Sequence, residues 1–307
     1  MIRRALVRLL QLPLVLFVTY ALSFWIVVAV PGNPFQRAGG RTLSPAVEQA
    51  LRQRYGMNDN WTFFRRHLGG VLRGDLGQST QYENWTCNEI VAAALPVSAA
   101  VGLCGVLIAL VGGVTLGTLA ALRPGGGWDR AALAVAVAGV SLPTFVTGAL
   151  LLVLFSAVLP WLPVGAWGRP ADLLRPAAAL SLLPMAYITR LTRSAMRDVL
   201  AADFIRAARA RGLTTAQIVR RHALRNALPP VVQYIGPAAA SAMTGSFVVE
   251  RVFNVPGLGV HFVNAILNRD QMLILATVIV YSSILFVLNM LADGAAALLD
   301  PRLGDAA

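Results

Sequence analysis

The chain has 307 residues, of which 57% are hydrophobic and only 13% charged, and its formal net charge at pH 7 is +12. A soluble domain carries roughly twice that share of charged residues, so the composition excludes an ordinary soluble protein and favours a protein built for a lipid bilayer. A basic balance also suits nucleic-acid binding, but in a chain with long uncharged runs we attribute it to the arginines of cytoplasmic membrane-protein loops.

Uncharged runs predict six transmembrane helices within a single domain covering residues 1–307. A bilayer span needs about 20 apolar residues. We place the six spans at about residues 9–30, 93–121, 132–157, 174–193, 230–249 and 271–292. The expected fold is therefore an all-α polytopic membrane protein with both termini in the cytoplasm.

The first apolar run begins like a signal peptide but is expected to remain as the first helix. It is too long for a signal peptide, and no A-x-A cleavage site precedes Pro31. Arg3, Arg4 and Arg8 should hold its start in the cytoplasm.

The polar segment of about residues 31–92 should then lie outside and fold into short helices. In "SPAVEQALRQRYG", Ser44 is a candidate N-cap, Pro45 suits the first helical position, and Gly56 follows the expected end. The later stretch "NWTFFRRHLGGVLRGDLG" predicts a second short helix with a glycine-rich exit.

Small residues and prolines are frequent in the expected spans. Small residues let membrane helices approach closely, whereas Pro143 and Pro184 should kink or break their helices. The composition leaves open whether these residues serve ordinary helix packing or line a translocation path.

Residues for catalysis or metal binding are missing from the pattern. His67, His222 and His261 fall in different segments and match no zinc spacing. All 26 basic residues are arginine, which excludes the lysine of a P-loop and of Schiff-base chemistry. The glycines of "RPGGGWDR", residues 123–130, are therefore expected to form a turn. Cys87 and Cys104 are not expected to form a disulfide.

The interiors of the spans, as placed, also lack the ionisable groups of a proton-coupled transporter. We therefore expect no catalytic residue, no metal ligand and no bound cofactor. Energy for uphill transport would have to enter from a partner.

An arginine-rich stretch interrupts the apolar pattern at residues 203–231. Leu200 to Gly212 should be helical, Thr214 or Thr215 should cap a second helix, and "LPP" at 228–230 should end it. Its small residues, Ala207, Ala208 and Ala210, would leave a low surface, that is, one without protruding side chains, among the arginines. This pattern favours docking of a partner over an inert loop, with anionic-lipid binding as a secondary role.

A second irregular segment follows the fifth expected span. Its candidate residues are Glu250, Asn254, Pro256, Gly257 and Gly259. Proline and glycine should prevent a regular helix there, and irregular backbone near a membrane must be covered by protein or water. A gate-lining loop and a tight surface turn both fit.

The arginine-rich stretch resembles the E-A-A-x-x-x-G-x(9)-I-x-L-P loop of permease subunits in binding-protein-dependent ABC importers. It matches in "RAARARG", residues 206–212, and in "LP" at 228–229, and departs from the pattern at Arg206 and Asn226. The resemblance implies a cytoplasmic coupling loop, at about residues 195–229, that contacts an ATPase subunit. The residues it assigns to this loop are Asp203, Arg206, Ala207, Ala208, Arg209, Gly212, Arg221, Leu228 and Pro229.

Further motifs extend the resemblance along the chain: "PGNP" (31–34), "GDLG" (74–77), "LPVS" (95–98), "LPVG" (162–165), "RHALRNALPPV" (221–231), "VVERVFNVPGLG" (248–259) and "DPRL" (300–303). Their order and spacing are similar to those of the B-type permease subunits of oligopeptide and dipeptide importers, and several lean towards the oligopeptide members. The implied fold is that of a type I ABC importer permease.

The resemblance implies a subunit of the bacterial inner membrane that pairs with a second, homologous permease. Two cytoplasmic ATPases using ATP and Mg²⁺, and an extracytoplasmic peptide-binding protein, would complete the complex. The same fold importing nickel, a glycoside or a dipeptide remains an alternative. A secondary transporter or channel, or a membrane enzyme, would need ionisable or catalytic groups that the pattern lacks.

Overall fold

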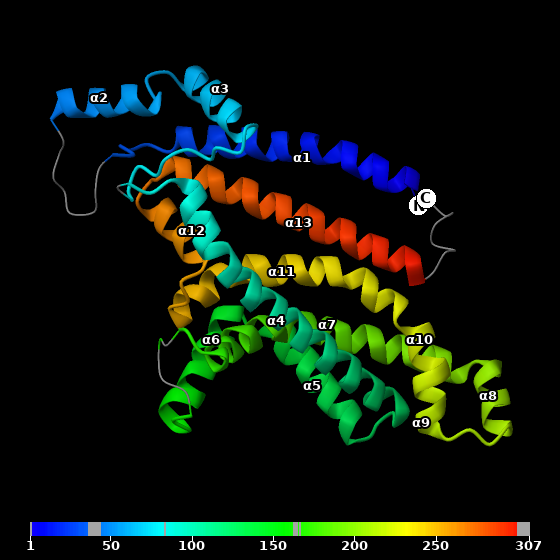
Figure 1. The fold of residues 1–307 in the computed structure, drawn as a ribbon. Coiled ribbons are helices and arrows are strands. Elements are labelled where there is room, and N and C mark those ends of the chain that lie inside the picture. Colours follow the sequence, from blue (N-terminus) through cyan, green and yellow to red (C-terminus); the bar gives the residue numbers. More distant parts are fainter. Residues whose placement is uncertain (1, 36–43, 83, 162–164, 166, 300–307) are drawn as a thin grey trace. The chain divides into compact units, whose positions relative to one another are not determined.

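The computed structural model describes residues 2–35, 44–82, 84–161, 165 and 167–299, and they are predominantly helical (Figure 1). Within these ranges the only β-type pairing is an isolated antiparallel bridge between Gln78 and Thr86. The motif "DPRL" and the first three residues of "LPVG" lie outside the described residues. The expected all-α fold is confirmed.

The long helices cover the expected spans. They are α1 (Ile2–Ala29), α4 (Cys87–Leu122), α5 (Gly127–Ser141), α7 (Leu174–Ala201), α11 (Pro229–Phe253) and α13 (Gln271–Leu299), and the 9-residue α6 (Thr144–Leu152) continues the span that begins with α5. The shorter elements are α2 (Pro45–Tyr55), α3 (Asn60–Val71), α8 (Asp203–Ala210), α9 (Thr215–Ile218), α10 (Leu224–Ala227) and α12 (Leu258–Leu267). Three further turns of helix are the π-helices η1 (Val153–Val158) and η3 (Val219–Ala223) and the 3₁₀-helix η2 (Pro170–Leu173).

Three helices of the described chain are long and apolar enough to cross a membrane by length and composition alone. They contain the ranges Leu10–Ala29, Cys87–Leu122 and Gln271–Ala295. A fourth candidate is the pair formed by residues 127–141 and 144–158, which is bent by 110°. The count of six spans therefore stays a prediction.

The bend falls at Pro143, where a break was expected. Leu142 precedes the proline and has extended backbone (φ −91°, ψ 120°), the conformation that proline imposes on the residue before it. The expected span over about 132–157 is therefore divided between α5, α6 and η1, with the break at the predicted proline. Pro184, by contrast, lies within α7, which continues through it.

Two compact units make up the chain. One comprises residues 1–6, 99–254 and 287–307, and the other residues 7–98 and 255–286. The chain therefore passes from one unit into the other within α1, α4 and α13 and, between residues 254 and 255, just after α11.

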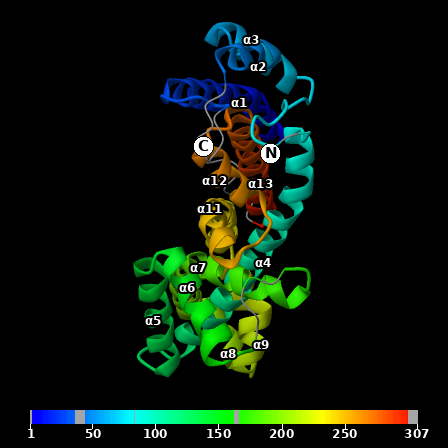
Figure 2. The same ribbon diagram turned by 90° about the vertical axis from the view of Figure 1, so that its left-hand side faces the viewer.

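In the first unit, α7 packs against α5, α6 and α11 (Figure 2). Glycines permit close contact between α4 and α7. A Cβ atom at Gly113 would lie 2.7 Å from a methyl carbon of Ile188, and one at Gly117 would lie 2.7 Å from the carbonyl oxygen of Thr189. At these positions the small residues serve helix packing.

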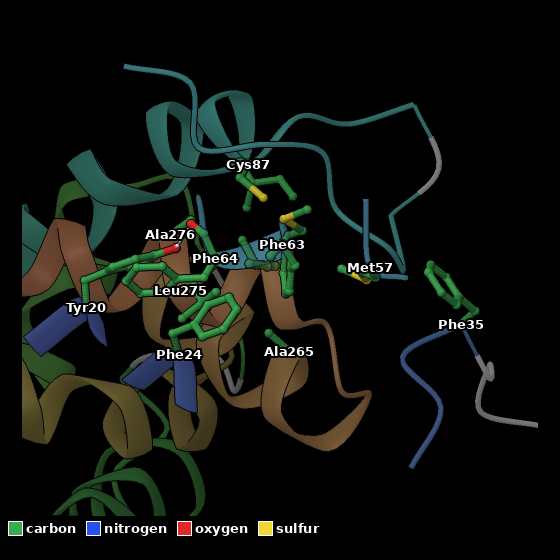
Figure 3. Packing of buried hydrophobic residues seen from close by; sticks show 13 residues of the cluster. Tyr20, Phe24, Phe35, Met57, Phe63, Phe64, Cys87, Ala265, Leu275 and Ala276 are labelled. Carbon is green, nitrogen blue, oxygen red and sulfur yellow. Dashed lines mark hydrogen bonds between the residues drawn. The ribbon is translucent and has the colours of Figure 1, made fainter. Parts of the chain in front are cut away.

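The second unit has an aromatic core that joins α1 to α3. Tyr20, Phe24 and Phe64 lie together, with ring centroids of Phe24 and Phe64 5.1 Å apart in an edge-on arrangement (Figure 3). The Tyr20 hydroxyl and Nδ1 of His67 are hydrogen-bonded at 2.9 Å. Leu273 and Leu275 of α13 belong to the same buried cluster. The polar segment after α1 is thus folded, as expected.

Local signals in that segment are confirmed. Ser44 caps α2 by accepting a hydrogen bond from the Val47 amide at 3.4 Å, and Gly56 ends the helix in the left-handed region at φ 71°. The second predicted helix is α3, and its N-cap is Asp59.

The segment is also joined to the start of α13. The buried carboxylate of Asp270 accepts hydrogen bonds from the Ser79 hydroxyl, the Thr80 amide and the Leu273 amide. Asp270 therefore connects the polar segment to α13 and also caps the start of that helix.

Candidate functional site

The arginine-rich stretch forms two short helical pieces at the end of α7 (Figure 1). α8 is followed by Gly212 in the left-handed region at φ 79°, as predicted. Thr214 then caps the second piece through a capping box with Gln217, in which the Gln217 amide donates to the Thr214 hydroxyl. The continuous helix expected from Leu200 is interrupted at Ala202, whose backbone is extended (φ −68°, ψ 151°).

The end of the second piece differs from the prediction. Leu228 keeps right-handed helical backbone (φ −75°, ψ −27°), and Pro229 is the first residue of α11. Proline is tolerated at this position because its missing N–H would lack a helical partner anyway. The "LPP" motif therefore starts the next long helix within a run that remains helical in geometry.

A small apolar cluster holds the two pieces in place. Ile205 and Ala208 of α8 are buried with Ile218 of α9, Met196 of α7 and Ala121 of α4. α8 packs against both α7 and α9. The stretch is thus a folded platform with a defined inner and outer face.

The outer face of α8 differs from the expected one. Ala208 is buried, with 7% of its surface exposed, so it packs inward and is not part of the low outer surface. Ala207 and Ala210 are exposed, as expected. Phe204 was missed by the sequence reasoning and is 48% exposed. Phe204 lies three residues before the exposed Ala207, a spacing that places two residues near each other on a helix surface and could have revealed it.

The arginines surround this face. Arg206, Arg209 and Arg221 are exposed. Arg206 pairs with Asp203 at 3.3 Å, one turn earlier on α8, but both side chains are largely in solvent, so this ion pair adds little stability. The platform therefore offers an aromatic ring, small residues and positive charge together.

A second charged contact ties the turn before α5 to α7. Arg193 Nε donates to Asp129 Oδ1 at 2.5 Å, and the Gly125 amide donates to Oδ2 at 2.8 Å. These donors hold the Asp129 pKa at about 2, with the Arg193 hydrogen bond the largest cause. The expected turn covers residues 123–126, and the rest of the stretch, residues 127–130, forms the first turn of α5, where Asp129 fixes the connection.

The other candidate segment, residues 250–259, is mostly buried. Glu250 lies fully buried in α11, which ends at Asn254 in the left-handed region (φ 54°). Gly257 is the N-cap of α12. Gly259 lies within α12, so the expectation that it excludes a helix is wrong. Pro256 is exposed. Whether the segment acts as a gate stays a prediction.

One buried arginine lies at the start of a helix that covers an expected span, where the interior was expected to carry no charge. Arg175, one residue into α7, is 3% exposed. Its Nη1 donates to the Ser156 hydroxyl at 2.6 Å, and its guanidinium lies 5.8 Å from the Phe253 ring centroid. The hydroxyl and the ring thus give this buried guanidinium polar and cation–π contacts within the protein.

No catalytic constellation emerges from this geometry. The described residues contain no group of three or more His, Cys, Asp or Glu side chains that could hold a metal ion. An open groove of about 840 Å³ between α5 and α7 is lined by apolar residues such as Leu133 and Val137, and also by the charged residues Asp129, Arg130, Arg190 and Arg193.

Comparisons of this sequence with a protein family and with individual known proteins agree with one another. Residues 113–305 match the family described as "binding-protein-dependent transport system inner membrane component". The chain is 39% identical over 289 residues to the dipeptide transport system permease protein DppB of Bacillus subtilis, covering 94% of this chain and 93% of the relative. It is also 39% identical over 291 residues to the oligopeptide transport system permease protein OppB of Escherichia coli K12, covering 94% of both chains.

A solved structure shares the fold. A chain of the inward-facing MetNI methionine ABC transporter superposes with a TM-score of 0.54 at 19% identity, covering 68% of this chain and 96% of the other. This likeness identifies the type I ABC importer permease fold.

Proposed function

This chain belongs to the family of binding-protein-dependent transport system inner membrane components, and we propose that it forms half of the peptide path of an ATP-driven importer. It is a permease subunit of an ABC importer. The observation that carries the peptide assignment is the 39% identity, over 94% of the chain, to dipeptide and oligopeptide permeases. Because DppB and OppB are equally similar, peptide length stays open, and oligopeptides are our first choice.

The subunit is a non-catalytic transport component, and we assign ATP hydrolysis to two cytoplasmic partner ATPases that use Mg²⁺. The absence of lysine from the sequence supports this division. The subunit itself would bind no cofactor. A second homologous permease would complete the path.

The folded platform of α8 and α9 supports a role in coupling. A surface transmits force only if it is firmly anchored. The cluster of Ile205, Ala208 and Ile218 anchors the platform to α7 and α4. Its outer face combines Phe204, Ala207 and Arg209, a mixture of ring, small side chain and charge that is typical of protein interfaces. We therefore place the ATPase contact here.

We propose that the subunit lies in the inner membrane of a bacterium. In the proposed orientation, this platform and both termini face the cytoplasm. Residues 190–225 contain nine arginines and two aspartates, which the positive-inside rule assigns to the cytoplasmic side. The folded segment of α2 and α3 would then face outward and help receive a peptide-binding protein.

Reconstitution tests the proposal. The complete complex in proteoliposomes should take up labelled peptide only when ATP is inside and the binding protein outside, and the isolated subunit should hydrolyse no ATP. Competition among dipeptides, pentapeptides, nickel and a glycoside identifies the solute. Uptake by this subunit alone, driven by a proton gradient, would instead establish a secondary transporter.

A further inference from the structure

A small polar cavity lies in the folded segment between α2, α3 and the turn that follows α3. Its volume is about 210 Å³. Residues lining it are Arg54, Tyr55, Phe63, Arg66, His67, Gly70, Asp75, Gly77, Gln78 and Met272. The buried members Phe63 and His67 are accompanied by the exposed, charged side chains of Arg54, Arg66 and Asp75. The transport role proposed above leaves this cavity without an assigned purpose.

The charges around the cavity do not balance. Arg54 and Arg66 bring two positive charges, and Asp75 brings one negative charge. Burial lowers the pKa of His67, which keeps that ring neutral near pH 7. The Asp75 carboxylate is occupied by its own turn, since Oδ1 accepts from the Gly77 amide at 2.9 Å. Within the described part of the chain, neither arginine forms an ion pair.

Both arginines are positioned by their neighbours. Arg66 lies across Gly56, where an added Cβ would come within 2.9 Å of its Nη1 atom. Arg54 Nη2 donates to Gln78 Oε1 at 3.5 Å. Positioning of this kind reduces the entropy lost when a guanidinium binds a ligand.

We propose that this cavity is a carboxylate-binding site. Two guanidinium groups with one excess positive charge match a carboxylate, which arginine binds through paired hydrogen bonds. Pockets for whole small molecules occupy about 300–1,000 Å³, so this cavity has room for a carboxylate head and a short stem. The carboxylate could belong to an acidic side chain of the binding protein or to the free end of a peptide. The first source rests on the proposed function, whereas the second is testable on the permease alone.

The lysine-free sequence makes a sharp test available. Arg66→Lys introduces the only lysine amine of the chain, since all 26 native basic residues are arginine. A water-soluble carbodiimide activates a nearby carboxylate, the amine displaces the activating group, an amide forms, and the carbodiimide leaves as its urea. Asp75→Asn is included in every variant so that the cavity's own carboxylate does not react. The matched control is Arg65→Lys, an exposed neighbour on α3 that does not line the cavity.

Two probes distinguish the source of the carboxylate. The purified complex is treated with carbodiimide in the presence of acetyl-trialanine, its carboxyl-amidated form, or the binding protein, and products are mapped by mass spectrometry. We expect an amide at position 66, at least tenfold above that at position 65, with either the free-carboxyl peptide or the binding protein. Adding Arg54→Gln should lower the yield about tenfold, as expected for the loss of a charge-assisted hydrogen bond.

Each result decides the matter. Coupling to acetyl-trialanine and not to its amidated form identifies a peptide end, and coupling to the binding protein identifies an acidic side chain. Equal yields at positions 65 and 66, or no effect of Arg54→Gln, would overturn the proposal. ATP-driven peptide uptake by the same variants is measured in parallel, so that failure of the site and failure of the transport function are told apart.

Discussion

The Ser98 hydroxyl oxygen accepts a hydrogen bond from the Leu258 backbone amide at 2.8 Å, across 160 residues of sequence. Both residues are buried. Gly257, the N-cap of α12, has no side chain to accept from the first turn of this helix, so a serine of α4 supplies the acceptor instead. The motifs "LPVS" and "NVPGLG" are therefore two halves of one contact.

Ser98→Ala should destabilise the protein by about 1–3 kcal/mol, because it leaves the buried Leu258 amide without its acceptor. Thermal unfolding of the purified subunit in detergent measures the effect. The matched control is Ser181→Ala, since Ser181 only donates to the Ala178 carbonyl one turn earlier in its own helix. Equal shifts for the two variants would mean that the contact with α12 contributes nothing of its own.

Ala207→Trp and Ala208→Trp should separate docking from folding. Ala207 is exposed on α8, so its replacement should leave the subunit level unchanged while blocking association of the ATPases. Ala208 is buried in the platform's apolar cluster, so a large ring there should cost about 1–3 kcal/mol or more through overpacking. Subunit level and ATPase co-purification are measured for each. Normal ATPase binding with Ala207→Trp would remove α8 as the contact surface.

Helices and their caps were predictable where a residue acts through its own backbone. Ser44, Gly56 and Gly212 have the roles expected of them, since capping and left-handed conformation depend on local chemistry. The break at Pro143 follows from the same kind of effect.

Features that depend on tertiary contacts could not be predicted. The inward orientation of Ala208 depends on the positions of α4 and α7, which supply Ala121 and Met196. Helix α12 was missed because its first turn depends on Ser98 from a distant helix. The sequence pattern also gives no sign that Arg54 and Arg66 line one cavity, because their proximity arises only when α2 and α3 pack.

Cysteine labelling should establish the orientation. Ser79, in the segment expected outside, is unsuitable as a labelling position because it is buried and hydrogen-bonded to Asp270. Gln53 on α2 and Ala216 on α9 are exposed. In spheroplasts, an impermeant maleimide should label Gln53→Cys at once and Ala216→Cys only after lysis. The parent chain, whose Cys87 is buried, provides the background. The reverse order of labelling would invert the proposed topology.

Acidification should weaken the folded segment through His67. Burial is the main cause that lowers its pKa, while the Leu76 carbonyl and the Asp75 charge act in the opposite direction. A histidine with a lowered pKa in the folded state favours unfolding once the pH falls below its unfolded value of about 6.5. The melting temperature should therefore fall between pH 7.5 and 5.5, and less so in His67→Gln. The same fall in both proteins would assign the effect to other groups.

Gly212 provides the most direct test of the platform. Its φ of 79° is unfavourable for residues with a Cβ atom, and a Cβ built there would meet nothing within 4 Å. Any effect of substitution therefore comes from backbone conformation and not from a clash. Asparagine tolerates this conformation, whereas a β-branched residue is strongly disfavoured in it. Gly212→Asn should keep peptide-stimulated ATP hydrolysis near normal. Gly212→Val should distort the connection between α8 and α9 and abolish both uptake and stimulated hydrolysis, while binding of peptide by the extracytoplasmic protein stays unchanged. Reconstituted complexes carrying each variant, matched for subunit content, are compared in uptake and ATPase assays. Full coupling in Gly212→Val would show that the left-handed turn, and with it the fixed geometry of the platform, is not required for transport.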